Sequence, residues 1–423
     1  MNTPADAHDA QLSPLEKLQL WREPHRIPVS IYTDAGIYAR ELDRIFYGPH
    51  WSYVALEVEI PRPGDFKTTF IGERGVIVVR GNAGEVRVLE NRCQHKGIRL
   101  LQAPFGNLGI AKRIICPYHQ WCYKLDGSLV GVPYRAGVGG QGGYPADFSL
   151  KAHGLGRLQV ACYQGVIFAC FDPAVDSFEN YLGPVVEPYL RRTFHGAPLR
   201  LLGYNRQRIR GNWKLMQENI KDPYHPGLLH AFFITFGLWR PDQRSRMVMD
   251  QHGRHACMIS ERNQGLRNAE VTEGVTSFKE GLKLADPGII DVAREDWWGE
   301  HTVVMQTIFP SVIIQQQINS LSTRQIVPAG PDAFDFIWTH FGYASDDLEM
   351  TARRLRQANL FGPAGYVSLE DGEVIEFSQQ AHRAYADRDS LAELGGRDTE
   401  PAEHMVTETL IRSMYRYYRE VMK

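Results

Sequence analysis

Apolar and polar residues follow different periods in different parts of the chain. Near the N-terminus, IYARELDRIFYG places apolar side chains at helical spacing, so residues 1–48 are predicted to be a polar, largely helical segment. Between 49 and 170 the pattern is one of short strands. GVIVVR and EVRVLE flank a turn at 81–85, and YHQWCYKL and SLVGVP flank Asp126-Gly127, a strong hairpin signal. This section is predicted to be a small antiparallel β domain.

The pattern changes again in the region 171–423. Strand-like runs such as HTVVMQTIF, SVIIQQQINSL and FDFIWTHFGYA come first. Helical periodicity follows in DDLEMTARRLRQANL, in the segment from Leu369 to Ala386 and in the C-terminal TETLIRSMYRYYREVMK. We therefore predict an α+β fold, in which a small antiparallel β domain precedes a larger domain that mixes strands and helices.

Composition narrows the class of protein. The chain has 423 residues, 47 basic and 49 acidic side chains and no basic cluster, which argues against a nucleic-acid partner. The N-terminus lacks the basic and apolar regions of a signal peptide, and no apolar run approaches the roughly 18 residues that span a membrane. We expect a cytoplasmic protein without a membrane partner, whose six cysteines are reduced rather than paired.

Two pairs of one cysteine and one histidine stand on neighbouring predicted loops. NRCQHKG contains Cys93 and His95, and CPYHQW contains Cys116 and His119. Mixed cysteine and histidine sets also hold structural zinc, so zinc is the alternative. The order C-x-H and then C-x-x-H is the pattern of a Rieske [2Fe-2S] centre, in which two cysteines bind one iron and two histidines the other. We predict that these four residues hold such a cluster.

A second group of metal-binding side chains lies in QENIKDPYHPGLLH. His225 and His230 are two nearby imidazoles, and two imidazoles with one carboxylate form the iron site of mononuclear non-haem oxygenases. Residues five apart on a regular helix lie about 140° apart around its axis. Pro226 and Gly227 fall between them, and a kink there is predicted to bring both imidazoles to one metal. The alternative is a pair of ordinary structural histidines.

The carboxylate of this site is sought in FGPAGYVSLEDGEVIE. This stretch offers Glu370, Asp371, Glu373 and Glu376, and their spacing does not choose among them.

Three motifs, CQH with CPYH, ENIKDPYHPGLLH, and FGPAGYVSLED, resemble those of the large (α) subunits of Rieske non-haem iron aromatic ring-hydroxylating oxygenases. The resemblance extends essentially from end to end. It implies a Rieske domain at 49–170, a catalytic domain with a central antiparallel sheet flanked by helices at 171–423, and packing of the N-terminal segment on the latter. It also implies Asp371 as the third iron ligand, with Glu370 as the fallback.

The resemblance gives Asp222 a role between subunits. An aspartate three residues before the first iron histidine would link His119 of one copy to His225 of the next, which implies a trimeric ring, commonly with small β subunits as α3β3. The alternative is a helix N-cap before Pro223. One residue fewer than in several relatives separates Asn219 from Asp222, so the resemblance does not place Asn219 relative to the iron.

The resemblance also implies the reaction. No G-x-G-x-x-G follows a predicted strand, so NADH must be used by a separate reductase, with or without a ferredoxin. The favoured activity is that of an anthranilate 1,2-dioxygenase, which converts anthranilate and O2 to catechol with loss of ammonia and carbon dioxide. The alternative is a salicylate 5-hydroxylase, giving gentisate, or another dioxygenase of ortho-substituted benzoates. An electron-transfer subunit without oxygenase activity is the alternative of a different class; the intact iron-site residues argue against it.

Two residues are predicted to contact the aromatic acid. In SVIIQQQIN, strand alternation leaves Gln316 as the polar member of an otherwise apolar face. A buried amide needs a partner, which we expect to be the substrate or a backbone carbonyl. The FGPAG resemblance places Phe361 in the same pocket, whereas an aromatic before a Gly-Pro helix stop is otherwise a core residue.

Overall fold

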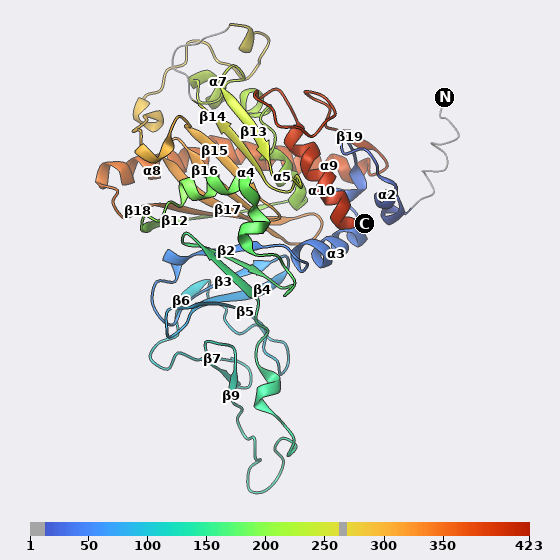
Figure 1. The fold of residues 1–423 in the computed structure, drawn as a ribbon, viewed down its shortest axis with the longest axis vertical. Coiled ribbons are helices and arrows are strands. Elements are labelled where there is room, and N and C mark those ends of the chain that lie inside the picture. The colour runs from blue at the N-terminus through green and yellow to red at the C-terminus, as the bar shows by residue number, and fades with distance from the viewer. Residues whose placement is uncertain (1–12, 262–268) are drawn as a thin grey trace. The chain divides into compact units, whose positions relative to one another are not determined.

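The computed structural model of the chain describes residues 13–261 and 269–423, so the first twelve residues of the predicted N-terminal segment lie outside the described residues. The chain forms two compact units (Figure 1). One unit is Phe46–Asp176, and the other combines the chain up to Ile45 with Ser177–Lys423. No helix in the described ranges is both long and apolar enough to cross a membrane.

The unit Phe46–Asp176, which is described throughout, consists of three small antiparallel sheets. The predicted hairpins are present, since β4 pairs with β5 and β8 pairs with β9. The sheets comprise β2 (Ser52–Leu56), β10 (Gln159–Tyr163) and β11 (Val166–Cys170); β3 (Asp65–Ile71), β4 (Arg74–Arg80), β5 (Val86–Glu90) and β6 (Phe105–Asn107); and β7 (Ile114–Ile115), β8 (Cys122–Tyr123) and β9 (Leu129–Gly131).

The other unit is built on a seven-stranded antiparallel sheet, visible in Figure 1. Its strands lie in the order β12 (Leu199–Ile209), β18 (Phe334–Tyr343), β17 (Ser320–Pro328), β16 (Val312–Gln317), β15 (Val303–Ile308), β14 (Ala256–Ser260) and β13 (Ser245–Met249). Two short strands, β1 (Arg26–Pro28) and β19 (Asp389–Leu391), pair separately.

Helices accompany this sheet, and the three predicted near the C-terminus are present. The α-helices among the described residues of this unit are α2 (Pro14–Leu20), α3 (Ala35–Glu41), α4 (Phe178–Thr193), α5 (Trp213–Asn219), α6 (Pro226–Leu229), α7 (Ala231–Phe236), α8 (Leu348–Phe361), α9 (Tyr366–Ala384) and α10 (Thr409–Met422), and the last three are the ones predicted near the C-terminus. Asp347 caps α8 by accepting a hydrogen bond from the amide of Met350 at 2.7 Å. The predicted α+β fold is confirmed.

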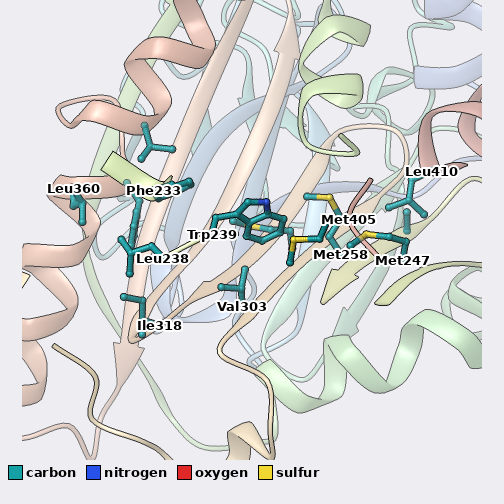
Figure 2. Close-up of a cluster of buried hydrophobic side chains, with 14 of the residues drawn as sticks. Phe233, Leu238, Trp239, Met247, Met258, Val303, Ile318, Leu360, Met405 and Leu410 are labelled. Atoms are coloured by element: carbon teal, nitrogen blue, oxygen red, sulfur yellow. The ribbon is translucent and has the colours of Figure 1, made fainter. Parts of the chain in front are cut away.

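Strand alternation gives the large sheet two different faces. On one face, α4 covers β15, and Gln306 Nε2 donates to the carbonyl of Val186 at 2.7 Å. On the other face a cluster of buried apolar side chains packs beneath α7 and α8. Figure 2 shows Trp239 within this cluster, between Leu238 and the pair Met258 and Met405. Burying each large apolar side chain contributes about 1.5 to 3 kcal/mol, so the cluster fixes these helices over the sheet.

Candidate metal centres

Two loops, 93–98 and 116–121, carry the four predicted cluster ligands and have the same hydrogen-bond pattern. In each, the cysteine amide donates to the carbonyl five residues later, and the amide four residues later donates back to the cysteine carbonyl, at 2.8 to 3.0 Å. The residue four positions after each cysteine has a left-handed backbone conformation, with φ 74° at Gly97 and 56° at Gln120. Two equivalent tight loops therefore present one cysteine and one histidine each.

The four side chains meet at the ends of these loops. Nδ1 of His95 and Nδ1 of His119 lie 3.1 Å apart, and both rings are half-buried. Cys93 and Cys116 are 0% and 1% exposed. Burial raises the pKa of the Cys93 thiol, and the neighbouring Cys116 adds to the effect, so a bound cation is needed to favour the thiolates. Two converging imidazole nitrogens and two buried thiols fit a Rieske cluster.

Aromatic rings cover both histidines. The ring of Trp121 stacks on His95 with centroids 4.9 Å apart and planes 6° apart, and the ring of Tyr118 lies 3.7 Å from that of His119. Both aromatic residues belong to the CPYHQW motif that carries Cys116 and His119.

A further residue near the cluster was missed by the sequence analysis. The hydroxyl of Tyr123 lies 3.3 Å from Sγ of Cys93 and accepts a hydrogen bond from the amide of Gln94 at 3.2 Å. Because that hydroxyl accepts from the amide, its hydrogen is available to the sulfur. Tyr123 lies one residue beyond Cys122 in β8, and nothing in its spacing distinguishes it from an ordinary buried tyrosine.

His225, His230 and Asp371 converge in the other unit. Their ligand atoms all lie within 4.8 Å of one another. Oδ1 of Asp371 is 3.4 Å from Nε2 of His225 and 3.2 Å from Nε2 of His230. Of the four carboxylates that the sequence left open, the structure brings Asp371 to both imidazoles.

The backbone between the two histidines differs from the predicted kink. His225 stands at the N-cap position of α6 without a side-chain capping bond, and Pro226 occupies the first helical position, where its missing amide hydrogen would have had no helical partner. The chain leaves the helix at His230, whose ψ of 95° separates α6 from α7. The four-residue helix α6 lies between the two histidines and ends at His230, so both imidazoles can face one point. This corrects the prediction of a proline-kinked helix.

Each of these histidines has a second carboxylate behind its ring. Oε2 of Glu370 lies 2.6 Å from Nδ1 of His230, and Oδ2 of Asp222 lies 3.4 Å from Nδ1 of His225. The hydrogen bond to Glu370 fixes the tautomer of His230 that leaves its Nε2 available to a metal, whereas Nδ1 of His225 faces Asp222 without a hydrogen bond among the described residues. Glu370, the fallback ligand, thus lies on the far side of the His230 ring from Asp371.

The structure shows where Asn219 lies relative to the metal site, which the shortened spacing to Asp222 left open. Its Nδ2 donates to Oδ1 of Asp371 at 3.0 Å and lies 3.5 Å from Nε2 of His225. Its Oδ1 is buried without a hydrogen-bond partner among the described residues. The asparagine at the end of α5 therefore borders the metal site despite the shorter step to Asp222.

The charges of this site suit a cation. Burial opposes ionisation of all three side chains, but the carboxylates of Asp222 and Asp371 outweigh it and raise the pKa of His225 to about 9. Asp371 and Glu370 likewise raise the pKa of His230, and the two imidazoles hold the pKa of Asp371 well below its usual range. Two imidazole nitrogens and one carboxylate oxygen are the donor set of a mononuclear iron site, so the residues fit this metal.

The structure gives Gln316, for which the sequence left a substrate group and a backbone carbonyl open, partners within the protein. Its Oε1 accepts a hydrogen bond from Nη1 of Arg192 at 2.7 Å, and its Nε2 lies 3.3 Å from the carbonyl of His301. Gln316 faces α4, whereas Gln315 and Gln317 point to the opposite face. The partners of its amide are thus protein groups, which matches the backbone-carbonyl alternative.

Phe361 is 1% exposed and belongs to the apolar cluster that packs beneath α7 and α8. Its ring lies 6.0 Å from that of Phe233, which lies 5.2 Å from the ring of His230. Phe233 is therefore the aromatic neighbour of this metal ligand, and Phe361 packs behind it.

A centre of two cysteines and two histidines in a small β unit, together with a centre of two histidines and one carboxylate in an α+β unit, defines the Rieske non-haem iron oxygenases as a class. Residues 50–151 match the family model of the Rieske [2Fe-2S] domain, and 192–423 match that of the ring-hydroxylating α subunit catalytic domain. The chain belongs to this family of ring-hydroxylating oxygenase large subunits. It carries a [2Fe-2S] cluster and a mononuclear iron, and it receives electrons from separate reductase or ferredoxin components.

Individual relatives extend this comparison. The chain is 57% identical to the large oxygenase component of salicylate 5-hydroxylase from Ralstonia sp., covering 94% of each chain. It is 41% identical to the anthranilate 1,2-dioxygenase large subunit from Burkholderia cepacia, covering 94% of this chain and 93% of the relative. Naphthalene 1,2-dioxygenase from Rhodococcus sp. shares the fold, with a TM-score of 0.79, 24% identity and coverage of 96% and 98%. The higher identity to the salicylate enzyme favours salicylate over anthranilate, whereas the sequence analysis favoured anthranilate.

Proposed function

We propose that the chain is the large oxygenase component of a salicylate 5-hydroxylase. The 57% identity to such a component over 94% of both chains supports this proposal, whereas the anthranilate enzyme is 41% identical. In the proposed reaction, salicylate, O2, NADH and a proton give gentisate, water and NAD⁺. One oxygen atom enters the ring and the other leaves as water.

The proposed ligands follow the geometry of the two centres. Cys93, His95, Cys116 and His119 hold the cluster, and His225, His230 and Asp371 hold the iron. When bound, the cluster supplies single electrons and the iron activates dioxygen. The protein's part is to fix these donors, and Asn219 contributes by donating to the Asp371 carboxylate at 3.0 Å.

Asp222 is proposed to carry electrons between subunits. Its Oδ1 accepts hydrogen bonds from the amides of Tyr224 and His225 at 2.8 and 3.3 Å, so it also closes the turn before α6. Its Oδ2 lies 3.4 Å from Nδ1 of His225 and its side chain is partly exposed, which supports a contact with His119 of a neighbouring copy. This role rests on a trimeric ring of large subunits, and we propose an α3β3 assembly with small β subunits.

The proposed division of the chain assigns an N-terminal segment to 1–48, the Rieske domain to 49–170 and the catalytic domain to 171–423. The 49–170 section lies within the compact unit Phe46–Asp176.

The proposed function is tested by product analysis. The purified oxygenase, its reductase components and NADH are supplied in turn with salicylate and with anthranilate. Gentisate from salicylate supports the proposal, whereas catechol and ammonia from anthranilate support the second candidate; neither product would remove both. Iron analysis separates both from an electron carrier, because an oxygenase chain holds about three irons and a carrier chain about two.

A further inference from the structure

Arg324 in β17 is a buried cation with neutral partners. The residue is 4% exposed. Its Nη2 donates to Oε1 of Gln315 and lies 3.5 Å from Sδ of Met305, and its Nε has no hydrogen-bond partner among the described residues. The guanidinium carbon lies 4.1 Å from the centre of the Trp338 ring. An aromatic face and two uncharged side chains thus surround a positive charge.

Another buried arginine in the same unit, Arg354, has its positive charge balanced by carboxylates. Arg354 is 1% exposed and forms ion pairs with Glu295 at 2.6 Å and with Asp346 at 2.7 Å. Arg324 has no carboxylate within 4.0 Å among the residues that the structure describes. Burial lowers the pKa of Arg324 to about 9, so it remains a cation at neutral pH. Burying an unpaired charge is costly, which indicates that an anion belongs beside it.

The surroundings of Arg324 connect it to the iron site. The antiparallel register pairs Arg324 with Trp338, and the Asp371 carboxylate partly offsets the lowering of the Arg324 pKa by burial. The helix that carries Asp371 packs on this face of the sheet, where Ser368 Oγ donates to Oε1 of Gln207 at 3.5 Å. The unpaired cation therefore lies on the face of the sheet that α9 and its iron ligand cover.

A second polar atom without a hydrogen-bond partner among the described residues is Nδ1 of His340, which lies beside Trp338 in β18. The ring of His340 stacks on that of Trp338 with centroids 5.7 Å apart. Nε2 of His340 lies 2.8 Å from Oδ1 of Asn205 and must carry the hydrogen, which leaves Nδ1 as a buried acceptor without a partner among the described residues. A cation and an open acceptor on adjacent strands match a ligand that carries both an anionic group and a hydrogen-bond donor.

We propose that Arg324 binds the carboxylate of the aromatic acid and so positions its ring for hydroxylation. This inference rests on the proposed function, since it assigns the acidic group of that substrate to a residue. The planar guanidinium fork matches a carboxylate in two hydrogen bonds, and Gln315 holds one of its nitrogens in place. The same contact excludes neutral arenes, because they would leave the buried charge unpaired.

The test measures binding to the assembled holoenzyme. Equilibrium dialysis gives the Kd of radiolabelled salicylate and of its neutral analogue salicylamide for the wild type and for Arg324→Gln. The expected result is a Kd for salicylate that rises about tenfold to a hundredfold, with salicylamide changed less than about threefold. The matched control is Arg192→Gln, a half-buried arginine on the opposite face of the sheet, which should leave the ratio of the two Kd values unchanged.

Two results would overturn the inference: unchanged salicylate binding by Arg324→Gln, or an equal loss of salicylate and salicylamide. If that variant does not fold, Arg324→Lys keeps the charge without the fork and should weaken salicylate binding by a smaller factor. If neither folds, the wild type must bind salicylate at least about tenfold more tightly than salicylamide, and equal binding would exclude the contact. Wild type that makes no gentisate but binds another aromatic acid through Arg324 would defeat the proposed function and leave this inference standing.

Discussion

Glu370 accepts a hydrogen bond from Nδ1 of His230 over 2.6 Å, while the adjacent Asp371 faces Nε2 of the same ring at 3.2 Å. Two successive residues of α9 therefore hold one imidazole from opposite edges. The first fixes the hydrogen on Nδ1, and the second shares the metal position with Nε2. A carboxylate in this place increases the basicity of the ligand nitrogen and restricts rotation of the ring.

Glu370→Ala is accordingly expected to weaken binding of the mononuclear iron by about 10- to 100-fold. The measurement is iron per chain after dialysis against a graded chelator, with the cluster absorbance as an internal reference that should stay unchanged. Glu373→Ala, an exposed carboxylate on the same helix, is the matched control. Equal iron retention by both variants would show that Glu370 does not support His230.

Tyr123→Phe is expected to lower the reduction potential of the cluster. The hydroxyl lies 3.3 Å from the Cys93 sulfur, and a hydrogen bond to a ligand sulfur stabilises the more negative, reduced form. A net hydrogen bond of about 1 kcal/mol corresponds to roughly 40 mV for a one-electron couple. Potentiometric titration of the purified protein measures the change. A potential equal to or above that of the wild type would contradict this role.

Residue types and spacing were sufficient to predict the two cysteine and histidine pairs as one site, and the presence of that site favoured a second metal at His225 and His230. Strand alternation likewise predicted the β4–β5 and β8–β9 hairpins. The choice between Glu370 and Asp371 required the resemblance, since adjacent helical residues point about 100° apart and either could have faced the metal. In β16 the alternation does not reveal which face of the sheet borders the site, so the sequence could not choose between a substrate group and a backbone carbonyl as the partner of Gln316.

The strand β17 shows a different limit of pattern analysis. All nine of its residues are buried, yet SLSTRQIVP reads as a polar segment. From the sequence alone, polar residues are predicted to be exposed, because the groups that would hydrogen-bond to them in the folded protein are not known. Arg324 was therefore missed, although it is an unpaired cation on the face of the sheet where the Asp371-bearing helix α9 packs.

Glu218→Gln is expected to flatten the pH dependence of stability. Tyr32 donates to Glu218 Oε1 at 2.6 Å, Tyr415 contacts the same oxygen, and burial raises the pKa of Glu218 from 4.5 to about 7. The folded state thus keeps this carboxyl protonated where the unfolded chain ionises it. The resulting stabilisation is complete below pH 4.5 and is lost as the pH rises through about 7.

The loss across this range should be about 1 to 3 kcal/mol in the wild type and absent from Glu218→Gln. Urea unfolding at pH 5 and at pH 8 measures it as the difference between the two proteins. Parallel pH profiles would show that Glu218 has an ordinary pKa in the folded state.

Asp371→Ala tests the assignment of the third iron ligand. The substitution removes the oxygen that lies between both imidazoles, so the iron content should fall from about three to about two per chain while the cluster absorbance persists. Hydroxylation should be lost as well. A variant that keeps three irons and the wild-type rate would show that another residue completes the site.

Asp222→Asn separates the two roles of this aspartate. Asparagine retains an oxygen for the amides of Tyr224 and His225, so the turn before α6 should form as in the wild type. It loses the negative charge that faces His225 Nδ1, and the proposed path between subunits is thereby interrupted. Both metals should remain bound, while substrate-dependent oxidation of the pre-reduced cluster in a single turnover slows by about 10- to 100-fold. Asp347→Asn, which changes a helix-capping aspartate of α8, is the control for loss of a capping charge. If both variants oxidise at the same rate, Asp222 is a turn-forming residue and electrons reach the iron by another route.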